Sequence, residues 1–255
     1  MKILVVGDSC TDVFVYGDIT RLTPEAPVPV FNPIREVSNA GMSKNVANNL
    51  EALGETVYNI TNPNSIRKIR YVDHKSNQLV LRVDEHDYCD RISTGVLSSI
   101  KDNKCTIPMS GQVKIDAIII SDYCKGFLEE DDIQYICENN SNVFVDTKKK
   151  ISNWIYSADY LKINSLEYQE NKHFIDTNDW LLKKTIITKG NRGCSFKGEM
   201  YSTEDVEVKD ISGAGDTFLA GLVVEYLKTK DIEKAIDFAQ ECTKSVVQKH
   251  GVSTV

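Results

Sequence analysis

The stretch with the most potential for chemistry is Asp210–Thr217, which reads Asp-Ile-Ser-Gly-Ala-Gly-Asp-Thr and leads into the apolar segment Phe218–Leu227. Small residues let backbone N–H groups approach an anion, and a helix that begins here adds the positive end of its dipole. This pattern predicts a cradle for a phosphate group in transfer. Asp216 lies at its mouth, where a carboxylate is useful for taking a proton from an attacking hydroxyl. The alternative is a glycine turn with an aspartate cap and no chemistry.

A sheet has to hold such a cradle, and most of the chain alternates between strand and helix patterns. A β-branched run over residues 2–6 ends at Gly7-Asp8, which is typical of a buried strand that delivers polar groups into a crevice. Alternating strands and helices imply a mainly parallel, doubly wound sheet, so we expect a Rossmann-like α/β fold. The other expected elements are strands at 57–61, 116–120, 143–146, 160–163 and 185–188, and helices at 42–53, 92–101, 129–138, 165–170, 216–229 and 231–249.

Two segments break this rhythm. Residues 12–33 contain four prolines and short alternations, which favour extended edge strands without a helix. Residues 66–84 alternate around a polar centre, which predicts a hairpin that pairs with the first segment. We therefore expect one domain over 1–255 with a small β lid formed by about 12–36 and 66–85. Exposed lid edges are commonly buried against a second copy, so we predict a homodimer through the lid.

Composition narrows the class of protein. The 255 residues include 30 Lys and Arg against 37 Asp and Glu, which gives a formal charge of −7 and argues against a nucleic-acid partner. The longest aliphatic run, Ala117–Ile120, is too short for a membrane span, and we expect no signal peptide. Seven cysteines without a Cys-x-x-Cys pair favour a reducing, cytoplasmic location. Four histidines without metal-ligand spacing argue against a zinc site.

The glycine-rich motif resembles the C-terminal signature of the ribokinase-like (PfkB) carbohydrate kinases, and further matches follow the order of that family. They are the substrate motif Gly7-Asp8 with Asp12, the helix start Ala40-Gly41 with Asn45, the magnesium and phosphate motif Asn164 with Glu167, and the nucleotide loop Thr188-Lys189-Gly190 with Gly193. The resemblance implies a carbohydrate kinase that uses ATP and Mg²⁺. It leaves open a monovalent cation beside Asp210.

The resemblance also implies roles for single residues. Asp216 is the expected general base, and the backbone amides of Gly213, Ala214 and Gly215 are the expected anion hole. Glu167 is expected to act on Mg²⁺ through water. Implied sugar ligands are Asp8, Asp12, Gly41 and Asn45. Implied nucleotide-binding residues are Asn164, Glu167, Thr188, Lys189, Gly190, Gly193 and Ser212. Two alternatives stay open: Asp12 as a turn carboxylate, and Asn164 as a plain helix N-cap.

Within the family, the nearest resemblance is to the D-glycero-β-D-manno-heptose 7-phosphate kinases. It rests on Thr20–Val30, Ser121–Gly126 and Gly251–Val255, and it spans nearly the whole chain. It implies phosphoryl transfer to the anomeric hydroxyl of heptose 7-phosphate, giving the 1,7-bisphosphate, a step towards the lipopolysaccharide inner core or related heptose nucleotides. A sugar phosphate needs cations, and the candidates are Arg21, Lys44, Lys68, Arg70, Arg82 and Lys148. We favour Arg21, Arg70 and Lys148 as a group; the alternative for each is a surface ion pair.

The chain also departs from the family pattern. After Thr61 the family carries a further βα unit of roughly thirty residues, whereas here only residues 62–65 lead into the lid. Ala40 replaces the first glycine of its motif, and Gln240 replaces an asparagine near the adenine pocket. The chain stops at Val255 without a nucleotidyltransferase domain, so we expect another protein to activate the product. Two alternatives follow: a kinase for a different sugar or sugar phosphate, or a catalytically weak nucleotide- or sugar-binding module. The intact Asp216 and glycine loop argue against the second.

Overall fold

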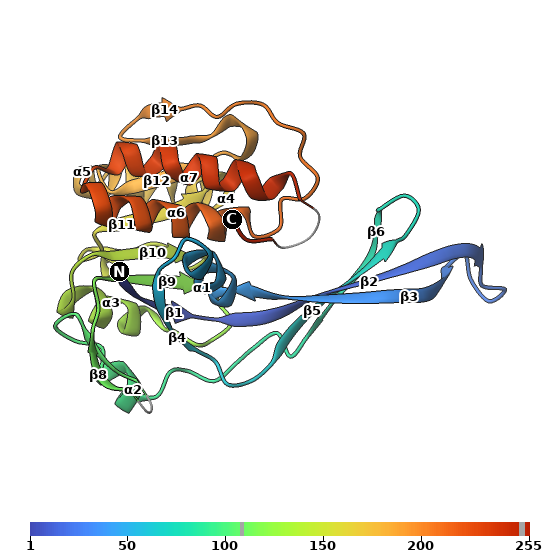
Figure 1. The fold of residues 1–255 in the computed structure, drawn as a ribbon, viewed down its shortest axis with the longest axis horizontal. Helices are drawn as coiled ribbons and strands as arrows, with labels where there is room; N and C mark the ends of the chain where they lie inside the picture. The colour runs from blue at the N-terminus through green and yellow to red at the C-terminus, as the bar shows by residue number, and fades with distance from the viewer. Residues whose placement is uncertain (108–109, 250–252) are drawn as a thin grey trace.

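An eight-stranded sheet forms the centre of the molecule, and a narrow β lid projects from it (Figure 1). The computed structural model describes residues 1–107, 110–249 and 253–255. The strand order is β14-β13-β12-β11-β10-β9-β1-β4; neighbours are parallel from β12 to β4, and β13 and β14 are antiparallel. The strands are β1 (Lys2–Gly7), β4 (Thr56–Thr61), β9 (Ala117–Asp122), β10 (Val143–Thr147), β11 (Tyr160–Asn164), β12 (Thr185–Thr188), β13 (Cys194–Phe196) and β14 (Glu199–Tyr201). The expected mainly parallel α/β fold is confirmed.

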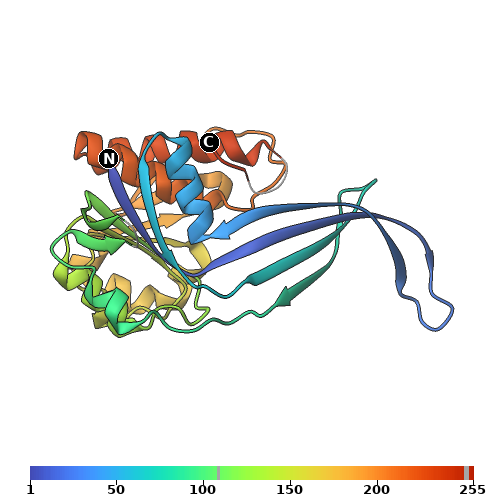
Figure 2. The same cartoon turned by 60° about the horizontal axis from the view of Figure 1, so that its bottom comes forward.

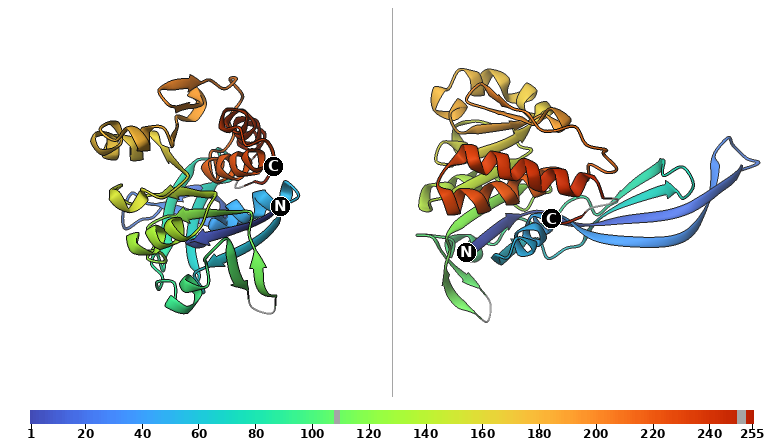
Figure 3. Two further views of the ribbon diagram at one scale, coloured as in Figure 1. Left: turned by 90° about the vertical axis from the view of Figure 1, so that its left-hand side faces the viewer. Right: turned by 45° about the horizontal axis from the view of Figure 1, so that its top comes forward.

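Helices cover both faces of this sheet because alternate residues of its buried strands point to opposite sides. In β1, Ile3 and Val5 pack against one helical layer, whereas Leu4 and Val6 pack against the other. All four side chains are fully buried, and each contributes about 1.5–3 kcal/mol through burial. The first layer is α1 (Ser43–Ala52), α6 (Ala214–Thr229) and α7 (Ile232–Val247); the second includes α3 (Glu130–Asn139) and α4 (Ser165–Asp176). Helices α6 and α7 lie side by side (Figure 3).

The lid is a separate four-stranded sheet with the order β3-β2-β5-β6. Its strands are β2 (Ser9–Leu22), β3 (Pro29–Met42), β5 (Ile66–Asp73) and β6 (Leu79–Glu85). The expected hairpin at 66–84 forms, and its first strand pairs in parallel with β2. The paired strands β2 and β3 begin and end beyond the segment 12–36, at Ser9 and Met42. Figure 2 shows how far they extend from the body.

Both roots of the lid leave from the two neighbouring strands β1 and β4. The buried Asn62 links the roots: its Oδ1 accepts the Ser9 N–H at 2.7 Å, and its Nδ2 donates to the carbonyl oxygens of Ser9 at 3.2 Å and Asn64 at 2.6 Å. No strand lies outside β4 in the part of the chain that is described. The chain therefore passes from the sheet edge into the lid without the extra βα unit, as the sequence indicated.

Several local expectations were wrong or incomplete. The helix expected at 92–101 is reduced to α2 (Thr94–Ser98), because Ser93 caps its start and Asp102 and Asn103 turn the backbone into the left-handed region. That turn leads into an unexpected hairpin, and α4 runs to Asp176 rather than ending at 170. Elements that the patterns did not predict are β7 (Lys104–Ile107), β8 (Gly111–Lys114), α5 (Asp179–Leu182), β13 and β14, and the 3₁₀ turns Asn153–Ile155 and Gly190–Arg192. Among the described residues, no helix has the length and apolarity needed to cross a membrane.

Candidate active site

The glycine-rich motif forms the start of α6. Gly213 is its N-cap with φ 80° and ψ 0°, a left-handed conformation in which a side chain would be strained. The N–H of Ala214 donates to the Ile211 carbonyl oxygen at 3.2 Å. Within the described residues, the N–H groups of Gly213 and Gly215 find no acceptor. Two of the three predicted anion-hole amides are thus free to receive an anion, and the third is already paired.

A buried ion pair lies against this cradle. The Nζ of Lys162 on β11 is 2.6 Å from Oδ2 of Asp146 on β10. A Cβ on Gly215 would lie only 2.9 Å from that Nζ, so glycine is what allows the ammonium to approach the helix start. Burial would lower the pKa of Lys162, but the charges of Asp146, Asp216 and Glu167 raise it overall, so the side chain stays cationic. The sequence reasoning missed this pair; the available signal was a lysine inside an apolar strand.

Asp216, the predicted base, is buried in the first turn of α6. Its carboxylate accepts hydrogen bonds from Asn45 Nδ2 at 2.9 Å and from the Tyr123 hydroxyl at 2.6 Å. Burial raises the pKa of Asp216 to about 6, and the two hydrogen bonds oppose that rise. A carboxylate with a pKa close to neutrality suits proton transfer at physiological pH. The structure therefore brings together Asp216 and Asn45, and it adds Tyr123, which the sequence reasoning did not assign to the site.

Asp8 holds the loop that follows β9. It is fully buried, and its two carboxylate oxygens accept the backbone N–H groups of Tyr123 at 2.6 Å and Phe127 at 3.2 Å. These bonds fix the loop that follows β9. A role for Asp8 in binding the sugar stays a prediction, and in this structure its carboxylate accepts hydrogen bonds from the backbone of that loop.

Asp12, Gly41 and Arg70 meet at the root of the lid. Arg70 on β5 forms an ion pair with Asp12 on β2, and both side chains are largely buried. Gly41 lies on the adjacent strand β3, where an added Cβ would fall 2.1 Å from Asp12 Oδ2. Glycine is therefore required for the carboxylate to keep this position. Lys68, which pairs with Asp12 in the register of β2 and β5, is buried here as well.

Arg21 is not part of this cluster. It lies exposed near the far end of β2, nine residues beyond Asp12 and so about 30 Å away along the strand. Lys148, in contrast, lies in the body of the site, where its Nζ is 2.9 Å from Glu167 Oε1. The predicted cation group is therefore divided: Arg70 and Lys148 lie in the site, whereas Arg21 does not reach it within one chain.

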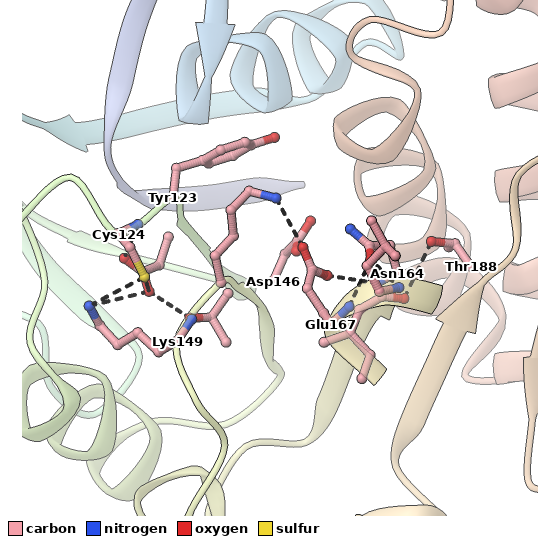
Figure 4. A network of polar contacts seen from close by, with 12 residues as sticks. Tyr123, Cys124, Asp146, Lys149, Asn164, Glu167 and Thr188 are labelled. Atoms are coloured by element: carbon pink, nitrogen blue, oxygen red, sulfur yellow. Dashed lines mark hydrogen bonds and ion pairs between the residues drawn. The ribbon is translucent and has the colours of Figure 1, made fainter. Parts of the chain in front are cut away.

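Asn164 and Glu167 form a reciprocal cap at the start of α4 (Figure 4). Asn164 Oδ1 accepts the Glu167 N–H at 3.0 Å, and Glu167 Oε2 accepts the Asn164 N–H at 2.7 Å. Asn164 is therefore the N-cap of α4, as the helix-cap alternative stated. The described residues contain no cluster of three or more His, Cys, Asp or Glu side chains that could hold a metal. Glu167 alone suits Mg²⁺, which commonly binds one or two carboxylates together with water and phosphate oxygens.

The predicted nucleotide loop follows β12. The Lys189 N–H donates to the Gly193 carbonyl oxygen at 2.7 Å, and Gly190 and Gly193 have φ of 61° and 83°. A Cβ on Gly193 would lie 2.0 Å from the Tyr201 carbonyl oxygen, so only glycine permits this turn. Thr188 donates to the Ile163 carbonyl oxygen at 3.3 Å, which ties the loop to β11.

Gln240 on α7 lies against the same loop. Its Oε1 would be 2.6 Å from a Cβ on Gly193, and it accepts no hydrogen bond from the described part of the chain. A buried acceptor without a partner is costly, so it indicates a place for an external donor such as the amino group of a base. On the other side, the Ser212 N–H donates to Asp210 Oδ1 at 2.8 Å, which shapes the approach to the phosphate cradle.

A cavity of about 390 Å³ opens beside Asn45, which also bonds to Asp216. Its lining is polar, with one lysine, and its volume is within the range of small-molecule sites. The lining residues are Asn39, Ala40, Asn45, Asn48, Lys249, Ser253 and Thr254. Of the terminal motif Gly251–Val255, Gly251 and Val252 lie outside the described residues.

These features define an α/β protein of ribokinase-like fold in which a glycine-rich helix start lies beside a buried carboxylate. The model of the pfkB family carbohydrate kinases matches residues 103–255, more than half of the chain. The chain therefore belongs to the pfkB family of carbohydrate kinases.

Curated relatives match almost the whole chain. It is 29% identical over 298 positions to the bifunctional protein HldE of Helicobacter acinonychis, with 98% of this chain and 63% of the relative covered. The corresponding protein of Nitratiruptor is 30% identical, with 99% and 63% covered. The chain thus spans less than two thirds of the length of these relatives. The 298 aligned positions exceed its 255 residues, which agrees with a missing segment.

Solved structures share the fold at low sequence identity. Ribokinase of Thermotoga maritima has a TM-score of 0.67 at 18% identity, covering 98% of this chain and 94% of that one. Arabidopsis thaliana ribokinase, solved with ribose and ATP, has a TM-score of 0.66 at 16% identity, covering 98% and 93%.

Proposed function

We propose that this kinase transfers the γ-phosphoryl group of ATP to the anomeric hydroxyl of D-glycero-β-D-manno-heptose 7-phosphate, giving the 1,7-bisphosphate. The observation that carries the chemistry is the buried Asp216 carboxylate, raised in pKa to about 6, in the first helical turn beside a free pair of backbone amides. The heptose assignment rests on the sequence resemblance and is supported by the similarity to HldE proteins.

The residues divide the work of the reaction. Asp216 takes the proton of the attacking hydroxyl, and Asn45 holds the carboxylate in place. The amides of Gly213 and Gly215 and the ammonium of Lys162 stabilise the negative charge on the transferring group. Because these groups are fixed by the helix start and by a buried ion pair, they need no reorganisation when the charge develops.

The nucleotide fits the opposite side of the cradle. The glycine turn at Gly193 and the unpartnered oxygen of Gln240 offer a place for the base, and we assign Thr188, Lys189, Gly190, Asn164 and Ser212 to the same ligand. Magnesium fits Glu167, whose partner Lys148 would have to yield one carboxylate oxygen to a metal-bound water. When bound, the ion neutralises charge on the phosphate oxygens. A monovalent cation beside Asp210 stays a prediction.

The sugar phosphate fits between the lid root and the base. The polar cavity beside Asn45 has the volume for it, and Asp12 with Gly41 can select hydroxyl stereochemistry. Arg70 and Lys148 are the cations that we assign to its phosphate group. One observation favours a different sugar or sugar phosphate as a second candidate: no strand outside β4 closes the crevice in the described chain.

We also propose that the whole chain acts as one kinase domain and that two copies pair through their lids. Both outer strands of the lid, β3 and β6, have open edges, and they carry large exposed apolar side chains. These side chains include Ile34, Val37, Leu79 and Leu81. Such a dimer would also place the exposed Arg21 of one lid near a second chain.

The test is MgATP consumption across heptose 7-phosphate, fructose 6-phosphate, ribose and adenosine, with Asp216→Asn as the control. Turnover of heptose 7-phosphate alone, lost in the variant, supports both the acceptor and the base. Turnover of another acceptor favours the second candidate. Bound ATP without turnover of any acceptor would instead favour a catalytically weak nucleotide-binding module.

A further inference from the structure

The hydroxyl of Tyr123 lies at a hydrogen-bonding position on the carboxylate that we propose as the base. It lies 2.6 Å from Asp216 Oδ1, the distance of a strong hydrogen bond to a carboxylate. A general base must come within the same distance of the hydroxyl that it deprotonates. A sugar hydroxyl that approaches Oδ1 along the same direction therefore has to displace the tyrosine hydroxyl, while Oδ2 accepts from Asn45.

The ring of Tyr123 lies among the cations of the site. Lys148 Nζ is 4.9 Å and Lys68 Nζ is 5.5 Å from the ring centroid, both within the range of a cation–π contact. Lys68 is buried, and burial lowers its pKa, so this cation gains from any anionic partner. Tyr123 thus directs its hydroxyl to Asp216 and its electron-rich ring face to the ammonium groups of Lys68 and Lys148. A bound sugar phosphate would direct its hydroxyl to the same carboxylate and its phosphate to the same ammonium groups.

The backbone beneath this side chain is held by hydrogen bonds, so a displacement of the hydroxyl would have to come from rotation of the side chain. The Tyr123 N–H is held by the buried Asp8, and the following loop is fixed by the Phe127 N–H on the same carboxylate. Cys124 and Gly126 adopt positive φ of 56° and 103°, which shape the turn. Figure 4 shows Tyr123 extending from this loop across the site towards the side that holds Asp146 and Glu167.

We propose that Tyr123 is a substrate-displaced plug: it covers the Asp216 carboxylate until the acceptor sugar arrives, and so it withholds the base from water. This inference rests on the proposed role of Asp216. Without the plug, water attacks the γ-phosphorus of ATP, its proton passes to Asp216, the bond from that phosphorus to the β–γ bridging oxygen breaks, and ADP and phosphate leave. A kinase that binds ATP before its sugar gains from suppressing this reaction.

The experiment compares Tyr123→Phe, which keeps the ring and removes the hydroxyl, with Tyr156→Phe. Tyr156 is 62% exposed and packs on Trp180, so it controls for the loss of a hydroxyl as such. In MgATP without sugar, we expect Tyr123→Phe to hydrolyse ATP about tenfold faster, and its KM for the sugar to fall about tenfold, the scale of one lost hydrogen bond to a charge. We expect Tyr156→Phe to match the parent in both assays.

A pH profile shows whether Tyr123 leaves Asp216 when substrate binds or stays hydrogen-bonded to it. The acid limb of kcat/KM reports the free enzyme, and that of kcat reports the substrate complex. The Tyr123 hydrogen bond lowers the pKa of Asp216, so Tyr123→Phe should move the kcat/KM limb to higher pH and leave the kcat limb in place. Other titratable or charged groups facing Asp216 are Cys10, Asp146 and Lys162, and all are unchanged by the substitution.

Three results would overturn the plug: unchanged ATP hydrolysis in Tyr123→Phe, a parallel shift of both acid limbs, or phosphate on Tyr123 after incubation in MgATP, which would make it an acceptor. The proposed function fails separately, when Asp216→Asn retains sugar phosphorylation. The double variant Asp216→Asn with Tyr123→Phe tests the plug and the base together. If Asp216 is the base that Tyr123 covers, the faster ATP hydrolysis of Tyr123→Phe must disappear in the double variant.

Discussion

The ammonium of Lys162 lies so close to the backbone of Gly215 that a single added Cβ would come within 2.9 Å of it. This contact joins a buried lysine on β11 to the start of α6, two positions that are far apart in the sequence. It places a full positive charge beside the partial positive charge of the helix start, and the two together favour a phosphate group.

Replacing Lys162 should therefore lower the rate of phosphoryl transfer more than it weakens binding of the sugar. Lys162→Met should lower kcat by about 100-fold to 1,000-fold and leave the sugar KM within a few-fold, because the charge acts mainly on the transition state. Steady-state kinetics checks this. Lys234→Met is the matched control, since that lysine pairs with Asp231 on the exposed side of α7. A larger effect on KM than on kcat would assign Lys162 to ground-state binding.

Asp216 predicts a pH dependence for activity. Its pKa of about 6 means that the carboxylate is deprotonated, and able to act as a base, only above that pH. The kcat/KM of the parent enzyme should therefore fall tenfold per unit below about pH 6. An acid limb near the ordinary value of 3.8 would show that another group limits the reaction.

The same residue predicts a cost in stability. Since the folded state raises the pKa of Asp216 above 3.8, it binds the proton more tightly than the unfolded chain, and stability is lost as pH rises through about 6. Two pKa units correspond to about 3 kcal/mol, an upper bound for this group. Asp216→Asn should thus be the more stable protein at pH 8, with a difference that shrinks at pH 5. Urea unfolding at the two pH values measures it, and equal stabilities at pH 8 would contradict it.

Gly41 predicts a specific loss of substrate recognition. Gly41→Ala forces the Asp12 carboxylate to move, because a Cβ would lie 2.1 Å from its Oδ2. We expect kcat/KM for the sugar to fall by up to about 100-fold, the effect of misplacing a positioning group by about 1 Å. Gly95→Ala is the control, since a Cβ there meets no atom within 4 Å. Equal kinetics for both variants would remove Asp12 from the sugar site.

The lid predicts the oligomeric state. Leu81 on the edge strand β6 is 54% exposed, and burial of this edge against a second lid would account for it. The parent protein should be a dimer by light scattering at micromolar concentration, and Leu81→Glu should be a monomer. Gln78→Glu adds the same charge at a polar position of the same hairpin and should leave the dimer intact. A monomeric parent would refute lid pairing.

The parts of the site that could be predicted are those encoded locally. The glycines before Asp216 and the caps of α4 act within one turn of chain, so their sequence patterns are sufficient. Lys162 and Tyr123 could not be found in this way, because their roles depend on which strand ends meet across the sheet. The hydrogen bonds of Asp8 were out of reach for the same reason, because its partners, Tyr123 and Phe127, are more than a hundred residues away.

Arg21 shows that a sequence motif can suggest a site residue that the fold places elsewhere. Its place in a motif suggested a role in the crevice, but the length of β2 carries it far from Asp12. The number of residues in a strand converts directly into distance, whereas a motif carries no measure of distance. The boundaries of the lid strands, which pattern alone placed at about residues 12 and 36, therefore mattered for function as well as for the fold.

The bridge that Asn62 makes to Ser9 has a mechanical consequence. Because one side chain joins both roots of the lid, a movement of one root has to carry the other with it or break the hydrogen bonds between Asn62 and Ser9. The lid is attached to the body at two adjacent points, which follow the paired strands β1 and β4. Contact of a second chain with the far end of the lid would therefore act on β1, the strand that leads directly to Asp8, whose carboxylate accepts the Tyr123 N–H.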